Sequence, residues 1–252
     1  MKRIFFLVCS VVILTSCEKK EDLVTSFEHS TVADCQGNEY ATVKIGNQWW
    51  MAENLKCNMY DTESNKAGQV IPGVTTLLVY TPTCFVILPT TISNVSNGVN
   101  YSINLTANQR TRLGGLYNWA AALGLADGQV DTVFVEPQQG ICPNGWHIPS
   151  GTEWSELINY INKNGGGKFK EPVGWFDNND STATTPAFAV LPAGYSRART
   201  INSLGFSTSF ISSTGTNALS AGSYYFSYNN DGVMSFSEVK NYGISVRCVK
   251  ND

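Results

Sequence analysis

Residues 141–154 read Ile-Cys-Pro-Asn-Gly-Trp-His-Ile-Pro-Ser-Gly-Thr-Glu-Trp, and the end of this stretch has the pattern of a helix start. Ser150 and Glu153 have the spacing of a capping box, in which each side chain accepts a hydrogen bond from the other residue's backbone amide. Apolar residues then recur on one helical face. They are Trp154, Leu157, Ile158 and Ile161. Glycines at 165–167 end the pattern, so the sequence predicts an amphipathic helix packed on a core.

Short apolar segments separated by turn residues flank this helix. A second short, buried helix is expected at 114–125, where Trp119 precedes three alanines. Turn residues at 34–38 predict a hairpin over 32–46, and a strand is expected at 48–51. Further short strands are expected at 188–192, 210–211, 224–226, 233–236 and 243–249. Few helices and many short strands indicate an α+β domain.

Composition excludes several classes of protein. Hydrophobic residues make up 42% of the 252 and charged residues 15%, whereas disorder needs low hydrophobicity and high charge. Seventeen Lys and Arg against twenty Asp and Glu give a net charge of −3, which does not suit a nucleic-acid partner. The sequence has only two histidines, and they do not have the spacing of metal ligands. A histidine-based catalytic site or a zinc site is therefore not expected.

The N-terminus has the pattern of a bacterial lipoprotein signal. A positive segment, Met1–Arg3, precedes an apolar run at 4–14 that is shorter than the ~20 residues a membrane-spanning helix needs. Residues 14–17, Leu-Thr-Ser-Cys, resemble the site where a thiol is lipidated before cleavage. We therefore expect a signal peptide at 1–16 and lipid attachment at Cys17. The alternative is an ordinary secretory signal with an incidental cysteine.

A charged segment follows the expected lipid site. Glu18–Asp22 reads Glu-Lys-Lys-Glu-Asp and resembles the surface-export signal of lipoproteins in the Bacteroidota. We expect residues 17–30 to be a flexible tether that holds the domain on the outer membrane, exposed at the cell surface. The membrane is then a partner only through the lipid anchor. The alternative is a solvated linker that happens to be charged.

Five cysteines follow the expected lipid site, so an odd one must remain after intramolecular pairing. Cys142 and Cys248 lie at the two ends of the best-patterned region, and we expect them to form a disulfide in an exported chain. The alternative is two buried thiols in contact. Among Cys35, Cys57 and Cys84, the sequence does not indicate which pair.

Several ordered blocks of the chain resemble one known family. The blocks are 42–56, 116–122, 141–150 with Glu153-Trp154, 191–195 and 245–250. Together they resemble the Fibrobacter succinogenes major paralogous domain, found in bacterial surface proteins and lipoproteins. The resemblance implies a C-type-lectin-like α+β fold, with two short helices packed on small twisted antiparallel sheets with long loops. It spans Val32–Asn251, so we expect one domain at 31–252 with a divergent β-rich insertion at about 66–112. One further departure is Ile211, where the family usually has an aromatic residue.

The same blocks give no support for catalysis. The stretch at 141–150 is also similar to the formylglycine-generating enzymes, which use two cysteines near the C-terminus, whereas this region contains only Cys248. No serine stands in a Gly-x-Ser-x-Gly elbow, and no paired acids are marked for acid/base work. We therefore expect a protein that is not an enzyme.

A candidate ligand site follows the predicted central helix. Trp175 and Phe176 are expected to stack on a glycan or a peptide, with packing beneath the loop as the alternative. Asp177, Asn179 and Asp180 offer oxygen ligands, so calcium is the single cofactor considered, although such clusters are more often turns. The sugar-binding amide motifs of calcium-dependent C-type lectins are not matched at 171–173 or 175–177.

These observations predict a non-catalytic, lipid-anchored surface domain for binding or adhesion, with a glycan or a protein as ligand. The alternative is a structural subunit or cap of a surface assembly. The sequence leaves the ligand and the oligomeric state open.

Overall fold

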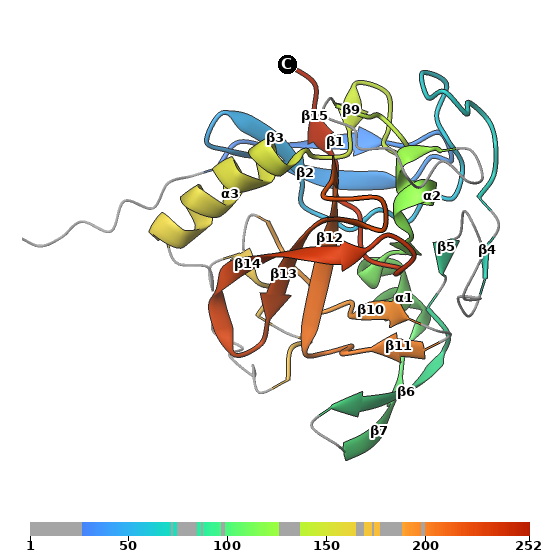
Figure 1. The fold of residues 1–252 in the computed structure, drawn as a ribbon, viewed down its shortest axis with the longest axis vertical. Coiled ribbons are helices and arrows are strands. Elements are labelled where there is room, and N and C mark those ends of the chain that lie inside the picture. The colour runs from blue at the N-terminus through green and yellow to red at the C-terminus, as the bar shows by residue number, and fades with distance from the viewer. Residues whose placement is uncertain are drawn as a thin grey trace, which may run out of the picture.

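The computed structural model describes the following parts of the chain (Figure 1): residues 27–71, 73–74, 85–86, 88–96, 99–125, 137–164, 169–172, 174–176, 188–197 and 200–252. The expected signal peptide at 1–16, the lipid site Cys17 and the cysteine at 84 lie outside the described residues. Among the described helices, none is long and apolar enough to span a membrane.

An antiparallel five-stranded sheet joins the two ends of the domain, in the order β1-β2-β3-β15-β9. Its strands are β1 (His29–Ala33), β2 (Glu39–Ile45), β3 (Gln48–Met51), β15 (Val249–Lys250) and β9 (Trp146–His147). The hairpin expected at 32–46 is confirmed as β1 and β2. Val249 pairs with Trp50 on one side and with His147 on the other, so the last strand lies between β3 and β9.

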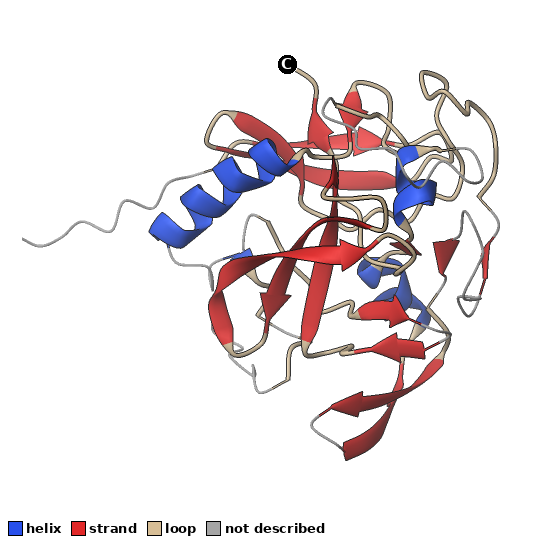
Figure 2. Ribbon diagram, in the orientation of Figure 1, coloured by secondary structure: helices blue, strands red, loops and turns tan. Residues whose placement is uncertain are grey.

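A second antiparallel sheet has three longer strands (Figure 2). They are β12 (Ser207–Gly215), β13 (Ser220–Ser227) and β14 (Asn230–Val239). Smaller pairings complete the described strands. They are β10 (Tyr195–Arg197) with β11 (Thr200–Asn202), β6 (Thr91–Ser96) with β7 (Val99–Asn104), and β5 (Phe85–Val86) between β4 (Gly73–Val74) and β8 (Leu116–Tyr117). With few short helices among these strands, the described part is an α+β fold.

The capping box gives the expected start of the longest described helix, α3 (Gly151–Asn164). Ser150 Oγ accepts a hydrogen bond from the Glu153 backbone amide at 3.3 Å, and the Glu153 carboxylate accepts one from the Ser150 amide at 2.7 Å. The helix expected at 114–125 is shorter than predicted. Because Leu116–Tyr117 pairs as β8 with β5, helix α2 (Trp119–Leu123) begins only after the N-cap Asn118.

Helix α1 (Ala107–Leu113) lies inside the region interpreted as a β-rich insertion, and it was not predicted. Thr106 and Gln109 form a capping box at its start, which is the sequence signal that identifies it. The neighbouring hairpin of β6 and β7 agrees with the expected β character.

Two expected strands are largely replaced by irregular chain. Within 188–192, Val190 makes an isolated bridge with Lys170, because the carbonyl groups of Phe188 and Ala189 accept hydrogen bonds from Arg247 instead of a neighbouring strand. Within 243–249, the residues before β15 contribute isolated bridges.

Helix α3 lies between the five-stranded sheet and the three-stranded sheet (Figure 1), and its apolar stripe packs against both. The rings of Trp154 on α3 and Trp50 on β3 have centroids 4.9 Å apart. The Trp154 indole also donates a hydrogen bond to the Ile211 carbonyl of β12 at 3.0 Å. Helix α2 packs in a second core cluster, which also contains Cys142 and Cys248.

A disulfide joins Cys142 and Cys248, with an S–S length of 2.04 Å, as expected. It links the chain just before β9 to the residue just before β15, across a sequence separation of 106. In the chain-entropy model, closing a loop of this size contributes up to about 4.7 kcal/mol to stability.

Arg247 lies beside this disulfide and has no exposed surface. Its Nε donates to the Asn54 side-chain oxygen at 2.9 Å, and its two terminal nitrogens donate to the carbonyls of Phe188 and Ala189. The guanidinium also lies over the Phe188 and Phe210 rings, at 4.5 and 5.1 Å from their centroids. Burial lowers the pKa of Arg247 to about 9, so the side chain is still charged at neutral pH.

We expect Arg247→Met to lower the free energy of unfolding by about 2–4 kcal/mol, because it leaves buried carbonyl groups without donors. Urea unfolding followed by tryptophan fluorescence measures this loss. Arg197→Met is the control, since Arg197 is exposed and its replacement should change stability by less than about 0.5 kcal/mol. Equal stability of the two variants would contradict the role assigned to Arg247.

Candidate functional site

The candidate site is a groove on the three-stranded sheet, and it arises because α3 covers only part of one sheet face. Side chains alternate between the two faces of each strand. The pairings Phe210↔Tyr224 and Tyr224↔Ser235 place these three residues on the face that meets α3. Trp154 of α3 stacks on Tyr224 and Phe210 there, with ring centroids 4.8 and 5.6 Å apart.

Beyond the first residue of α3, the same face carries small residues in place of large apolar ones. They leave a groove of about 330 Å³. The lining residues are Gly151, Ser212, Thr214, Thr216, Gly222, Tyr224, Ser235, Phe236 and Ser237. None of them is charged, and most carry a hydroxyl group, which can both donate and accept a hydrogen bond.

The start of α3 forms one end of this groove. The Gly151 amide donates to Thr214 Oγ1 at 2.9 Å, and the Tyr224 hydroxyl donates to the Gly151 carbonyl at 3.2 Å. At the other end, the Thr216 and Ser237 hydroxyls lie 2.5 Å apart and join the residue that follows β12 to β14. The groove therefore has two hydrogen-bonded ends.

Gly222 lies on β13 between these ends. A Cβ atom built there would lie 3.5 Å from Ser212 Cβ, an ordinary van der Waals distance. A larger side chain at 222 would therefore extend into the groove without a backbone clash at its first atom. The exposed apolar residues of this end of the sheet lie nearby: Leu219, Phe236 and Val239.

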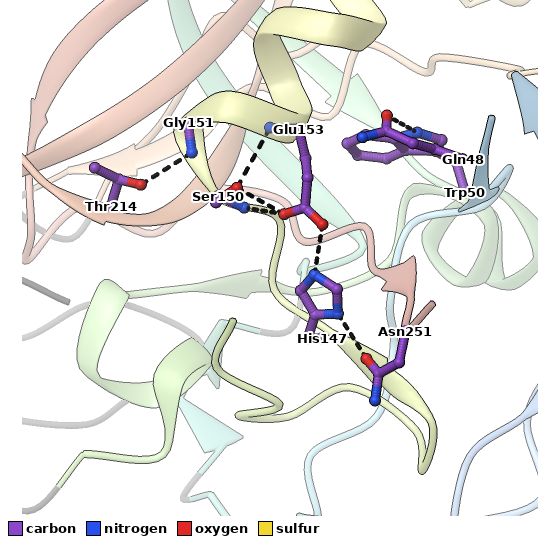
Figure 3. A network of polar contacts seen from close by, with 8 residues as sticks. All are labelled: Gln48, Trp50, His147, Ser150, Gly151, Glu153, Thr214 and Asn251. Atoms are coloured by element: carbon purple, nitrogen blue, oxygen red, sulfur yellow. Dashed lines mark hydrogen bonds and ion pairs between the residues drawn. The ribbon is translucent and has the colours of Figure 1, made fainter. Parts of the chain in front are cut away.

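A polar network fixes the start of α3 next to the groove (Figure 3). His147 on β9 places Nε2 2.7 Å from Glu153 Oε1 and Nδ1 2.6 Å from Asn251 Oδ1. Because the Glu153 carboxylate only accepts, Nε2 of His147 donates to it, and the Asn251 side-chain oxygen beside Nδ1 favours the charged imidazole. The second carboxylate oxygen of Glu153 accepts from the Ser150 hydroxyl at 2.7 Å.

This network stabilises the start of α3 and does not activate a nucleophile. Burial acts to lower the pKa of His147, but the hydrogen bonds to Glu153 and Asn251 outweigh it and leave that pKa above its ordinary value. Burial acts to raise the pKa of Glu153, but the bonds from His147 and Ser150 leave it lowered. Ser150 bonds to the carboxylate and not to the imidazole, so serine and histidine do not form a nucleophile–base pair.

The structure places the two aromatic residues of the predicted ligand site in different environments. Trp175 is only 5% exposed, and its indole donates to the Val190 carbonyl at 3.2 Å, so it packs in the core instead of offering a stacking face. Phe176 is half exposed, yet its ring stacks on Phe206 with centroids 4.4 Å apart. The two rings therefore do not form one exposed platform.

The oxygen ligands predicted for calcium, Asp177, Asn179 and Asp180, lie outside the described residues, so that site stays a prediction. Just before them, Glu171 is buried, and one of its carboxylate oxygens pairs with Arg112 at 2.6 Å. Glu171 is the acidic residue of the segment 171–173 that was compared with the lectin motif, and the Arg112 guanidinium neutralises its charge.

Sequence reasoning did not identify the groove. Its signal is the alternation in β14 that places Ser235 and Ser237 on one face, next to the hydroxyl-rich strand β12. The pattern does not show that α3 begins beside Tyr224, and only this position leaves the small residues uncovered.

Comparison with known proteins gives one match. A family model described as the Fibrobacter succinogenes major domain matches residues 43–250, from within β2 to the end of β15. Neither a curated protein nor a solved structure matches the chain significantly.

The His147–Glu153 pair gives stability a defined pH dependence. His147 contributes fully below its ordinary pKa, and its contribution is lost as the pH rises through the raised pKa. Glu153 contributes above its ordinary pKa, and its contribution is lost as the pH falls through the lowered one. We therefore expect stability to fall on the alkaline side of the His147 pKa, because the charged partner of Glu153 is lost there. Urea unfolding at a series of pH values measures this fall.

Glu153→Gln is the matched variant, because glutamine preserves the capping box but carries no charge. Its stability should vary less with pH over the range in which His147 titrates. An unchanged pH profile in this variant would contradict the pairing.

Proposed function

The chain belongs to the Fibrobacter succinogenes major domain family. We propose that it is a non-catalytic, lipid-anchored binding domain of the bacterial cell surface. Its proposed fold is C-type-lectin-like. Two features support that proposal: an α+β arrangement with few short helices, and a disulfide that ties the chain before α3 to the last strand.

The groove at the start of α3 is the observation that carries the binding role, and its proposed ligand is a neutral glycan. A volume of about 330 Å³ lies at the lower end of the range of ligand pockets. Hydroxyl groups suit the sugar hydroxyls, which also donate and accept hydrogen bonds. The lining has no charge to pair with an acidic or a basic ligand. The Tyr224 ring, held by Trp154, adds an aromatic surface at the helix end.

A structural role in a surface assembly is the second candidate, and β14 favours it. Within the described residues, β14 pairs only with β13, so its outer edge presents unpaired backbone groups. Phe236 and Val239 are exposed on this strand. A partner that adds a strand there would bury Val239 as well as Phe236, whereas a small glycan in the groove would contact Phe236, which lines it, and not Val239.

Lipid anchoring is proposed from the N-terminal pattern that ends at Cys17. Several acyl chains hold a domain at a membrane without a spanning helix, at about 0.8 kcal/mol per buried CH₂. In bacteria grown with labelled palmitate, the wild-type chain should incorporate label and Cys17→Ser should lose it. Cys9→Ser is the control and should keep the label, because residue 9 lies within the expected signal peptide. Label retained in Cys17→Ser would contradict the anchor.

The groove is tested with the full chain on an array of neutral and acidic oligosaccharides, followed by calorimetry with the best neutral binder. Gly222→Leu should weaken binding at least about tenfold, equivalent to ~1.4 kcal/mol, because the side chain fills the groove. Met234→Leu is the control, since Met234 pairs with Tyr225 and both point to the opposite sheet face. Thermal unfolding of each variant confirms that it is folded.

Three outcomes would contradict the glycan proposal: an array without binding, binding only to acidic glycans, or equal affinity of Gly222→Leu and wild type. An empty array together with a stable complex that masks Val239 would favour the structural role instead.

A further inference from the structure

The β1–β2 turn holds one of the two free cysteines of the described chain in a fixed position. Cys35 is exposed within this turn. The neighbouring Asp34 carboxylate accepts hydrogen bonds from the backbone amides of Gln36 and Asn38, at 2.9 and 3.0 Å. It also accepts one from the Tyr40 hydroxyl at 2.6 Å. The turn is therefore anchored on both sides of Cys35.

A distant part of the chain lies directly against this turn and carries the other free cysteine, Cys57, which is buried. On one side of it, the Lys56 amide donates to the Tyr40 hydroxyl at 3.2 Å. On the other side, Asn58 and Gln36 form two reciprocal hydrogen bonds of 3.0 and 3.1 Å. Contacts flanking both cysteines thus hold the two segments together.

The two thiols meet at the same backbone carbonyl. Cys57 Sγ donates to the Met59 carbonyl at 3.0 Å, and Cys35 Sγ approaches the same oxygen at 3.4 Å. The two side chains lie close enough that each affects the pKa of the other. No other pair of free cysteines is placed together in the described part of the chain.

We propose that Cys35 and Cys57 are a site of oxidation, at which an external organic disulfide converts the thiol pair into a second intramolecular disulfide. In the first step, the Cys35 thiolate attacks one sulfur of the external disulfide, forms a mixed disulfide and releases one thiol. In the second step, the Cys57 thiolate attacks the Cys35 sulfur and releases the second thiol. One external disulfide is reduced to two thiols, and two protein thiols become one disulfide.

Exposure determines the order of these steps. An external disulfide can reach Cys35, whereas Cys57 has no exposed surface and reacts only within the molecule. Burial raises the pKa of both thiols, and the nearby Asp34 carboxylate adds to the rise at each. Thiolate is therefore scarce at neutral pH, so formation is slow without an oxidoreductase and faster in alkaline buffer.

The proposed bond would fix the β1–β2 turn to a segment that belongs to the core. The Cys57 carbonyl accepts a hydrogen bond from the buried Tyr117 hydroxyl at 2.5 Å, and the Cys57 side chain belongs to the core cluster of α2. The site is independent of the groove on the three-stranded sheet, so its failure would leave the proposed binding function untouched.

The test is peptide mapping of the folded, full-length chain after incubation with oxidised glutathione, alkylation of remaining thiols and non-reducing digestion. Trypsin cleaves after Lys44, Lys56 and Lys66, so the cysteines at 35, 57 and 84 fall in separate peptides. We expect a peptide pair linked through Cys35 and Cys57. The oxidised chain, which has both disulfides, should have a higher midpoint of thermal unfolding than the chain that has only the Cys142–Cys248 disulfide.

Three variants separate the steps. Cys57→Ser should stop at a stable mixed disulfide between Cys35 and glutathione, and Cys35→Ser should leave Cys57 unoxidised in the folded chain. Cys84→Ser is the matched control and should still form the linked pair. A stable glutathione adduct on Cys35 in the wild-type chain, or a linked peptide that contains Cys84, would overturn the proposal.

Discussion

The buried guanidinium of Arg247 is the contact on which the arrangement of the domain depends. Its hydrogen bonds reach Asn54, which follows β3, and the carbonyls of residues 188 and 189, while its flat faces lie on two aromatic rings. Asn54 also contacts α1, because its side-chain amide donates to the Leu113 carbonyl at the end of that helix at 2.9 Å. Because a buried charged group must have its donors satisfied, Arg247 holds its own segment against Asn54 and against residues 188–189, and Asn54 adds the end of α1. The neighbouring disulfide holds the same region covalently.

A second constraint is the place where α3 begins. The capping box and the His147–Glu153 bond set that start, and the bonds of Gly151 to Thr214 and Tyr224 fix it against the sheet. Large apolar side chains lie where the helix covers the sheet, and hydroxyl groups and glycine lie where it does not. The groove is thus a consequence of helix position as much as of sheet sequence. Its neutral chemistry sets it apart from the charged contacts at Arg112 and Glu171.

Local patterns predicted the local parts of this structure. The spacing of Ser150 and Glu153 gave the start of α3, turn residues gave the β1–β2 hairpin, and the positions of Cys142 and Cys248 gave their disulfide. Long-range contacts caused the misses. The carbonyls of residues 188 and 189 accept hydrogen bonds from Arg247 instead of from a neighbouring strand. The Trp175 indole donates to the Val190 carbonyl in the core instead of lying on a loop surface. Neither the buried arginine nor the groove has a local signature, since each depends on which distant segments meet.

The position of β1 also determines how the domain responds to a pulling force. This strand is the outermost of the five-stranded sheet, is mostly exposed, and is the first element reached from the N-terminus. Phe27, just before the strand, packs against Tyr160 of α3 and against Phe169, and His29 pairs with Val43 at the terminal end of the antiparallel ladder. Tension on the preceding chain therefore first pulls Phe27 away and then peels the strand one residue pair at a time. The other four strands of the sheet come after the β1–β2 turn in the chain, and they include β15, which follows the disulfide-bonded Cys248. A domain tethered through this end would therefore yield first by losing β1, and could extend under tension while α3, the groove and the core remain folded.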